Sequence, residues 1–370
     1  MVGVSALKGL LNEHAEITSL PEQSPQNKPE NMSLSVLVDD IARSEHGLIM
    51  LMGKGGVGKT TLTGMMIQYL ADKKEGPILA VDAGGTSIKY SLVSNDTLDQ
   101  LTEEHFFNMP SSGTKEELMG TFAAVLEGAM EQSRKIDCTI ASTAFSVPGP
   151  FDCKNGISLM PHKWAAVKGV CLPEEFEKMN ILPPHIPTYF LHDVHAFLVG
   201  EKFFGAAANH TNTLGIIIGT GLGVGVWENN DLGLDENGNP LYSIFKRPFR
   251  EGILEDYVSG RAIREAYRCV TGLSHDAKTI EIAARNGDDV AKKVYRDMGT
   301  ILGENIRDIV ERHRIECIVV GGRVSLAFDL YQDALCEAVG HGVTAYASKL
   351  LESAAMRGVA AWSVHCQKNK

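Results

Sequence analysis

The chain has 370 residues, of which 44% are hydrophobic and 22% are charged, a composition typical of two or three globular domains with sizeable cores. A net charge of −11 argues against a nucleic-acid partner held by a general basic surface. No run of about 18 apolar residues predicts a membrane span, and the N-terminus does not resemble a secretory signal. Seven scattered cysteines without a CxxC pair predict reduced thiols in the cytoplasm and no structural zinc site.

The first part of the chain, residues 1–76, predicts a linker followed by one strand–helix unit. Residues 1–17 indicate a short helix, and residues 19–33, rich in Pro, Gln, Asn and Ser, are typical of a linker. A helix, SLSVLVDDIARSEH, and an apolar strand, GLIMLMG, lead into a glycine-rich loop and the helix TTLTGMMIQYLADKK. The loop satisfies the Walker A pattern in its required setting, and its phosphate-binding positions are Gly53, Gly58, Lys59 and Thr60.

From Ile78 the pattern changes to alternating strands and helices, which indicates the α/β class. The strands ILAVD and IKYSLV flank a glycine turn, and a helix, LMGTFAAVLEGAMEQSRK, follows them. Further strands are predicted at CTIASTAFSV and PTYFLHD. The apolar run TNTLGIIIG then leads through a second glycine turn into VGVWEN. The remainder is mostly helical apart from the buried strand ECIVV.

Three glycine-rich turns follow predicted strands, at residues 82–89, 219–223 and 321–325. In the first, paired glycines let the backbone approach a phosphate, the Thr86 hydroxyl can donate, and Asp82 suits a hydrated Mg²⁺. The third precedes a helix, whose N-terminus favours a phosphate or polar nucleotide group. Each alone could be an ordinary turn that needs glycine for its dihedral angles. Together, in this order and with these strands, they favour one nucleotide site.

The segments DAGGTSIK, GTGLGVGV and VVGGRVS resemble the two phosphate motifs and the adenosine motif of the ROK sugar kinases. The resemblance covers about residues 77–361 and includes VPGPFD at Val147–Asp152. It implies a two-lobed, actin-like (ribonuclease H-like) α/β ATPase fold behind the P-loop fragment, a cleft for ATP, Mg²⁺ and a sugar, and a homodimer. We expect lobes at 77–193, completed by a C-terminal helix at 350–364, and at 194–349. The nucleotide residues it implies are Asp82, Gly84, Gly85, Thr86, Lys89, Gly219, Thr220, Gly221, Gly223, Gly321, Gly322 and Ser325.

The predicted strand in TYFLHDVHAFLVG ends at His192-Asp193, and a helix follows. Asp193 could simply cap that helix. However, the segment is similar to the family's Asn-Asp-Ala-Asn stretch, which implies that Asp193 is the catalytic base for the sugar hydroxyl. A carboxylate within hydrogen-bond reach suits this role, because phosphoryl transfer depends mainly on positioning and on neutralising phosphate charge.

Two departures from the family pattern leave the choice of sugar open. His192 and His195 replace the two asparagines, although an imidazole at His192 can still donate to a sugar hydroxyl. In RPFREGILEDYVSG, Glu255 matches the family's sugar-binding Glu; alternatively it is an ordinary acid at a helix N-terminus. Ile253 stands at a zinc-ligand Cys of the family, and neither GxH nor CxxCG appears between Asn229 and Glu251, so no zinc is expected.

Residues 1 to about 72 resemble the start of the second half of the arsenite-pump ATPases, with Lys54 at their extra signature lysine. The later motifs of that class do not follow, because the next strand pairs within the kinase and cannot easily serve two sheets. A single strand–helix unit also cannot bury both faces of a parallel strand. We therefore expect a P-loop fragment that performs no hydrolysis, joined to a whole kinase.

Two alternatives to a sugar kinase stay open. One is a sugar-sensing regulator of the same fold, although such proteins usually carry an N-terminal helix-turn-helix and this N-terminus is a linker plus P-loop. The other is a residual arsenite-pump-like ATPase, against which the missing later motifs argue.

Overall fold

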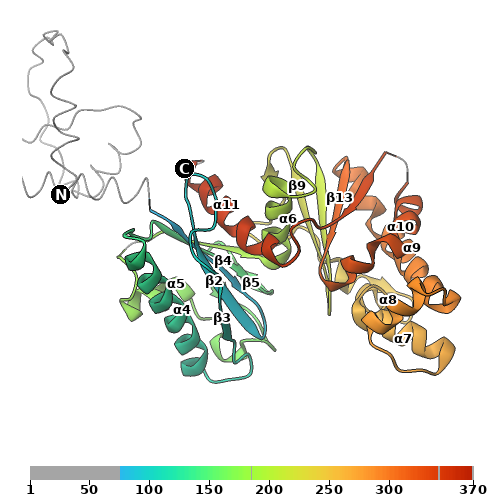
Figure 1. Cartoon of the computed structure of the whole chain (residues 1–370), viewed down its shortest axis with the longest axis horizontal. Helices are drawn as coiled ribbons and strands as arrows, with labels where there is room; N and C mark the ends of the chain where they lie inside the picture. The colour runs from blue at the N-terminus through green and yellow to red at the C-terminus, as the bar shows by residue number, and fades with distance from the viewer. Residues whose placement is uncertain (1–75, 185, 341, 369–370) are drawn as a thin grey trace, which may run out of the picture. The chain divides into compact units, whose positions relative to one another are not determined.

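The computed structural model describes residues 76–184, 186–340 and 342–368 (Figure 1). The chain divides into a unit of residues 1–66 and a unit of residues 67–370, and all the described residues belong to the second unit. The predicted P-loop, with Gly53, Gly58, Lys59 and Thr60, lies outside the described residues, as do the linker and helices expected before it.

The first sheet has five strands in the order β3-β2-β1-β4-β7. The expected hairpin of the first two strands is confirmed, since they pair antiparallel with Asp82 opposite Lys89. Strands β4 and β7 run parallel to β1, so the C-terminal ends of these three strands meet at one edge of the sheet. There Asp82 lies opposite Ser146, and His192 lies opposite Val147. The bounds are β1 Ile78–Ala83, β2 Ser87–Val93, β3 His105–Asn108, β4 Ser142–Val147 and β7 Thr188–His192.

Helices cover both faces of this sheet, which explains its nearly continuous apolar strands. One face packs an aromatic cluster in which Phe122 of α4 and Phe176 of α5 meet Phe145 of β4. The other face packs against α6 and α11, whose buried residues form a separate core cluster with β1. The bounds are α4 Lys115–Lys135, β5 Phe151–Asp152, β6 Ile157–Ser158, η1 Ala165–Val167, α5 Leu172–Met179, α6 Asp193–Phe204 and α11 Ala354–Lys368.

The second sheet, β10-β9-β8-β13-β14, repeats the strand order and directions of the first. Its bounds are β8 Thr213–Ile218, β9 Leu222–Glu228, β10 Asp231–Leu232, β13 Cys317–Gly321 and β14 Thr344–Ala347. The helices beside it are α7 Gly260–Thr271, α8 Ala277–Arg285, α9 Asp289–Arg312 and α10 Gln332–Val339. Shorter elements are η2 Ile244–Lys246, β11 Pro248–Phe249, β12 Gly252–Ile253, η3 Leu254–Asp256, η4 Arg323–Leu330 and η5 Leu351–Ser353.

The outer strands β3 and β14 were not predicted from the sequence. Each has only four residues. Every residue of β3 is exposed, and in β14 only Ala345 is buried, so both are too short to give a clear apolar pattern. Their pairing is decided by the neighbouring strand.

Helix α6 lies beside α11 (Figure 1) and also packs against β8 and β9 of the second sheet. Two glycines allow the helices to approach closely. A Cβ at Gly358 would lie 1.7 Å from the Ala196 carbonyl oxygen, and one at Gly200 would lie 2.1 Å from that of Ala354. The wholly buried Glu201 fastens the segment before α11, because its carboxylate accepts hydrogen bonds from the Ser348 hydroxyl and the Leu350 backbone N–H. The helix that begins with Asp193 is therefore rigidly held.

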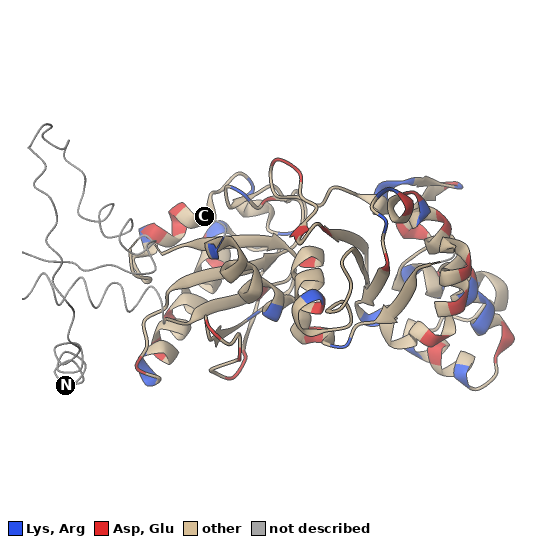
Figure 2. Cartoon of the chain, turned by 90° about the horizontal axis from the view of Figure 1, so that it is seen from above, with Lys and Arg blue, Asp and Glu red and all other residues tan. Residues whose placement is uncertain are grey.

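Charged residues of both signs are distributed over the described part of the chain. In Figure 2, acidic and basic residues intermingle on the helices at the right-hand end of the view, and no single basic face forms there. In the described ranges, no helix is long and apolar enough to cross a membrane.

Gly358→Ala should destabilise the folded protein by about 1–3 kcal/mol, because the added methyl group forces α6 and α11 apart. Gly120→Ala in α4 is the matched control. This glycine is exposed, and a Cβ there meets nothing within 4 Å, so alanine should stabilise the protein by roughly 0.4–1 kcal/mol. Urea unfolding of both variants measures the difference. Equal midpoints would show that the close helix contact does not limit stability.

Candidate active site

A cavity of about 590 Å³ opens where the end of β7 faces the turn between β8 and β9. It brings together the predicted base, the predicted sugar-contact residues and the second glycine turn, while residues from two further segments complete its wall. The lining residues are Pro148, Gly149, Pro150, Leu159, Lys163, His192, Asp193, Val194, Ile217, Gly219, Thr220, Gly221, Leu222, Gly223, Val224, Asp235, Asn239, Pro240, Tyr242, Ser243, Ile244, Phe245, Lys246 and Glu255.

Asp193 is the first residue of α6, and its carboxylate opens into this cavity while the walls surround it. One carboxylate oxygen accepts the backbone N–H of Val194 at 2.7 Å, so the residue does satisfy one donor at the helix start. Burial raises the pKa of Asp193, and His192, the Val194 N–H and Lys163 act in the opposite direction. A carboxylate with a raised pKa is a stronger proton acceptor, as a general base requires.

The His192 ring is held by two acceptors. Its Nε2 lies 2.8 Å from Asn239 Oδ1 and 3.3 Å from the Phe151 carbonyl oxygen, an arrangement in which Nε2 carries the proton. Gly149 leaves the room for this ring, because a Cβ there would come within 2.8 Å of His192 Cε1. Gly149, in the VPGPFD segment, therefore leaves space for the ring of His192, the residue that replaces the family's asparagine.

Asn239 and Asp235 line the cavity and were missed by the sequence reasoning. Asp235 accepts the backbone N–H groups of Asn237 and Asn239 at 2.9 and 2.8 Å and the Asn239 side-chain amide at 3.2 Å. Burial tends to raise the pKa of Asp235, but these hydrogen bonds outweigh it and lower the pKa. Asp, Asn and Gly in sequence signal a turn. Nothing local indicates that the turn reaches His192, which lies on another element.

His195 is fully buried within α6 and is not among the cavity-lining residues. Burial lowers the pKa of His195 to about 3, so the ring is neutral. It packs against Gly225, where a Cβ would come within 2.8 Å of Cδ2, and neither ring nitrogen has a hydrogen-bond partner among the described residues. His195 therefore belongs to the core.

Glu255 reaches the second glycine turn. Its Oε2 accepts the Leu222 backbone N–H at 3.0 Å and lies 2.8 Å from where a Cβ of Gly221 would sit. Within the turn, the Gly219 N–H donates to the Gly221 carbonyl at 2.9 Å. The contact requires glycine at position 221, and it places the Glu255 carboxylate between the turn and the cavity rather than on an unrelated helix surface.

Asp82 is the second-last residue of β1, at the sheet edge where β7 leads into Asp193. Burial raises the pKa of Asp82, Lys89 and the Ser146 hydroxyl oppose this, and the negative charge of Asp193 adds to it. Lys89 lies 3.7 Å from Asp82 and also donates to the Glu352 carbonyl. The Asp82 carboxylate, with Asp193 near enough to raise its pKa, fits a divalent cation held through water, since Mg²⁺ prefers one or two carboxylates. Like the other residues of the first turn, Lys89 does not line the cavity.

The first and third turns lie outside the cavity lining. In the first, the Gly84 N–H donates to the Ser87 carbonyl, and the Thr86 carbonyl accepts the Met109 N–H. In the third, Gly322 has φ 81°, and a Cβ there would lie 2.4 Å from the Ile218 carbonyl oxygen. The remaining predicted residues of the third turn are also engaged: Gly321 abuts the Phe197 ring, and the Ser325 hydroxyl donates to the Gly322 carbonyl.

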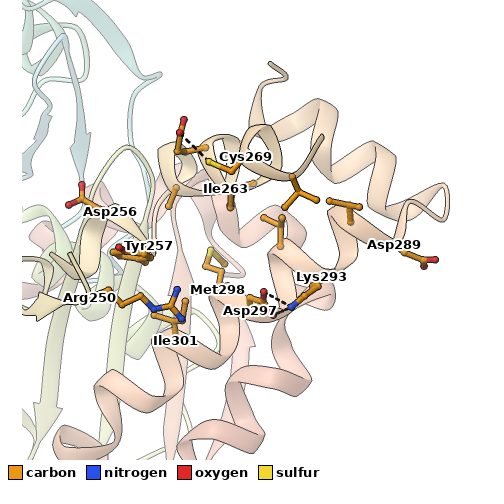
Figure 3. Close-up of a pocket in the computed structure, with 16 residues that line it drawn as sticks. Arg250, Asp256, Tyr257, Ile263, Cys269, Asp289, Lys293, Asp297, Met298 and Ile301 are labelled. Carbon is orange, nitrogen blue, oxygen red and sulfur yellow. Dashed lines mark hydrogen bonds and ion pairs between the residues drawn. The ribbon is translucent and has the colours of Figure 1, made fainter. Parts of the chain in front are cut away.

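A second cavity, of about 550 Å³, lies between α7, α9 and the β11–β12 hairpin (Figure 3). Apolar residues such as Ile263 and Met298 line it, while the ion pair of Lys293 and Asp297 and the Arg250 guanidinium over the Tyr257 ring lie around it. It contains none of the predicted site residues. In the described residues, no group of three or more His, Cys, Asp or Glu side chains could hold a metal ion.

The kinase-like part of the chain matches the ROK family model over residues 78–240 and 248–365, and the chain therefore belongs to the ROK family. A glucokinase from Thermotoga maritima is 26% identical over 287 residues, covering 71% of this chain and 86% of the relative. An N-acetylmannosamine kinase from Escherichia coli is 27% identical over 258 residues, covering 67% of this chain and 84% of the relative.

Solved structures share the actin-like ATPase fold. A ROK family glucokinase from Streptomyces griseus, in complex with glucose and AMPPNP, matches with a TM-score of 0.61 and 24% identity over 77% of this chain and 98% of that one. A ROK family transcriptional regulator, a homologue of the E. coli MLC protein, matches with a TM-score of 0.68 and 20% identity over 78% of both chains. The fold is thus shared by an enzyme and a regulator.

The N-terminal residues match a different class of protein. An arsenical pump-driving ATPase from Escherichia coli is 89% identical over 73 residues, and a second, from Acidiphilium multivorum, is 67% identical over 72 residues. Each match covers 20% of this chain but only 12% of the relative's length. The chain therefore joins a short P-loop ATPase segment to a ROK domain.

Asp193→Asn should raise the melting temperature at neutral pH. Because burial raises the pKa of Asp193, the folded protein holds this proton more tightly than the unfolded chain, and stability falls as the pH rises through the folded pKa. Asparagine avoids that loss, so the gain should shrink as the pH approaches the ordinary value of 3.8. Asp235→Asn is the matched control of opposite sign, since hydrogen bonds lower the pKa of Asp235. A lower melting temperature for Asp193→Asn at neutral pH would contradict the assignment.

Proposed function

We propose that this protein phosphorylates a hydroxyl group of a hexose or related sugar with ATP and Mg²⁺, and that Asp193 is the general base. The observation that carries the proposal is that the Asp193 carboxylate and the glycine turn at 219–223 line the same cavity. Membership of the ROK family and the glucokinase and N-acetylmannosamine kinase relatives support the reaction class. We further propose that the protein lies in the cytoplasm, in keeping with its seven free cysteines. We also propose that it forms a homodimer.

Residues that line the cavity and the turns outside its lining have separate roles in this proposal. We assign the lobes to residues 77–193 with the C-terminal helix and to residues 194–349. The backbone of both phosphate turns binds the ATP phosphates, and the turn at Gly321, Gly322 and Ser325 lies near the adenosine. Mg²⁺ held through water by Asp82 would neutralise phosphate charge. Glu255, His192 and Asn239 orient the sugar, and no zinc is required.

The carbonyl and amide groups of Asn239 give the cavity a donor and an acceptor beside the base. Asn239 Oδ1 is occupied by His192 and one proton of its amide nitrogen by Asp235, so the second amide proton is left to meet a sugar hydroxyl. A site built on such hydrogen bonds discriminates strongly against sugars that lack the matching hydroxyl. We therefore expect a clear preference within a hexose panel that includes glucose, mannose, allose and N-acylhexosamines.

Asp193→Asn should lower kcat on the best sugar by about 10²–10⁴-fold, the usual contribution of a positioned general base. A coupled assay of ADP release over the hexose panel measures this. Thermal melting of the same preparation shows that the variant is folded. Wild-type kcat in Asp193→Asn would contradict the mechanism.

The regulator of the same fold supplies the second candidate, a sugar sensor without catalysis. A DNA mobility-shift assay with and without sugar distinguishes it. DNA binding that responds to sugar, in a protein that phosphorylates no member of the panel, would favour the sensor.

Removal of residues 1–75 should leave sugar phosphorylation intact, because the ROK match begins at residue 78 and the first sheet begins at Ile78. We expect kcat within about twofold of the full chain, which corresponds to a change of under 1 kcal/mol. Loss of soluble, active kinase would show that the P-loop segment is structural. Arsenite-stimulated ATP hydrolysis that survives Asp193→Asn but not Lys59→Ala would instead revive the pump-like ATPase.

A further inference from the structure

Lys163 lines the cavity together with Asp193, although it belongs to none of the motifs that the sequence singles out. Its side chain crosses the first glycine turn. A Cβ added to Gly85 would lie 2.9 Å from Lys163 Cδ and 3.2 Å from Nζ. On its other side Lys163 acts electrostatically on Asp193. The ammonium group thus lies between the first phosphate turn and the base.

The backbone that carries this lysine is firmly anchored by the next residue. Trp164 is fully buried and packs edge-on against Phe122, with 5.6 Å between ring centroids. Its backbone N–H donates to the Ser111 carbonyl at 2.9 Å, and its φ of 56° is a conformation that persists only where the surroundings enforce it. The Lys163 side chain therefore projects into the cavity from a fixed point.

The charge of Lys163 acts on Asp193, but across residues 76–184, 186–340 and 342–368 no carboxylate forms an ion pair with it within 4.0 Å. Lys89, which the sequence placed at the phosphates, is instead engaged by Asp82 and by the Glu352 carbonyl.

Two lysines line the cavity, Lys163 and Lys246. The Lys246 ammonium lies over the Phe245 ring, 5.1 Å from its centroid, whereas Lys163 lies at the side of the first turn. Lys163 is therefore the cavity lysine placed to meet a phosphate at that turn.

We propose that Lys163 is a further catalytic residue, whose ammonium binds the γ-phosphoryl oxygens of ATP during transfer; the inference rests on the function proposed above. The sugar oxygen attacks the γ-phosphorus, and its proton passes to Asp193. The bond from this phosphorus to the β–γ bridging oxygen breaks, and ADP leaves with the electron pair. Lys163 stabilises the negative charge on the equatorial oxygens of the γ-phosphoryl group during its transfer.

This placement also explains why glycine stands at position 85. A methyl group there would overlap the lysine stem and push the ammonium away from the turn. Gly85→Ala should therefore weaken catalysis through Lys163, and its effect should be smaller in the Lys163→Met background than in the wild type.

The test compares Lys163→Met and Lys163→Arg with Lys168→Met, a control from the same segment whose side chain is exposed and does not line the cavity. Lys163→Met should lower kcat about 10²–10³-fold, as the loss of one charge-stabilising donor does. The KM for sugar should stay within about twofold, because the lysine acts on the phosphoryl group rather than on sugar binding. Lys163→Arg should recover part of kcat, and Lys168→Met should match the wild type.

Calorimetric binding of AMPPNP and ADP gives a readout that needs no sugar turnover. Lys163→Met should weaken AMPPNP binding and leave ADP binding unchanged, since only AMPPNP carries the γ-phosphoryl group. Retention of kcat and of the AMPPNP-to-ADP affinity ratio would overturn the role of Lys163 while the sugar kinase stands. The opposite result is also possible: the wild type phosphorylates no sugar, and Lys163→Met abolishes the preference for AMPPNP over ADP. That result would support the contact between Lys163 and the γ-phosphoryl group and overturn the proposed function.

Discussion

Three parallel strands, β1, β4 and β7, end at one edge of the first sheet, and the positions of Asp82 and Asp193 depend on that pairing. It brings Asp82 and Asp193 close enough for the charge of one to raise the pKa of the other, although more than a hundred residues separate them in the chain. Neighbouring carboxylates of this kind disfavour each other's charged form, and a divalent cation or a proton relieves the repulsion. In the proposed function, this sheet edge therefore combines the general base with the acid that would hold Mg²⁺.

Helix α6 converts this edge into a cavity. It begins with Asp193, packs against β8 and β9 of the second sheet, and is fastened to α11 through close glycine contacts and through Glu201. Because α6 contacts both sheets, the base keeps a defined position relative to the turn at 219–223. Positioning of this kind supplies much of the catalytic effect in phosphoryl transfer. In the proposed reaction, the contacts between α6 and α11 would thus contribute to catalysis by holding Asp193 in place.

The sequence predicted the α/β class, the β1–β2 hairpin, the strands that carry the turns, and the base at the start of a helix. These features depend on local patterns: apolar runs, glycine turns, and an acid between a strand and a helix. The outer strands β3 and β14 were missed because they are short and have little apolar alternation. Lys89 was assigned to phosphate from its place beside the first turn, whereas the hairpin register turns it towards Asp82 and Glu352.

By itself, then, the sequence determined that a ROK domain follows a P-loop segment, and that Asp193 lies at a junction of strand and helix in a domain with three glycine-rich turns. Only the tertiary structure decided which side chains surround that carboxylate. Asn239 reaches it through His192, and Lys163 reaches it from a loop anchored by the buried Trp164. Such contacts join residues far apart in the chain, and their geometry depends on how the two sheets and α6 pack. Local sequence patterns do not encode that distance information.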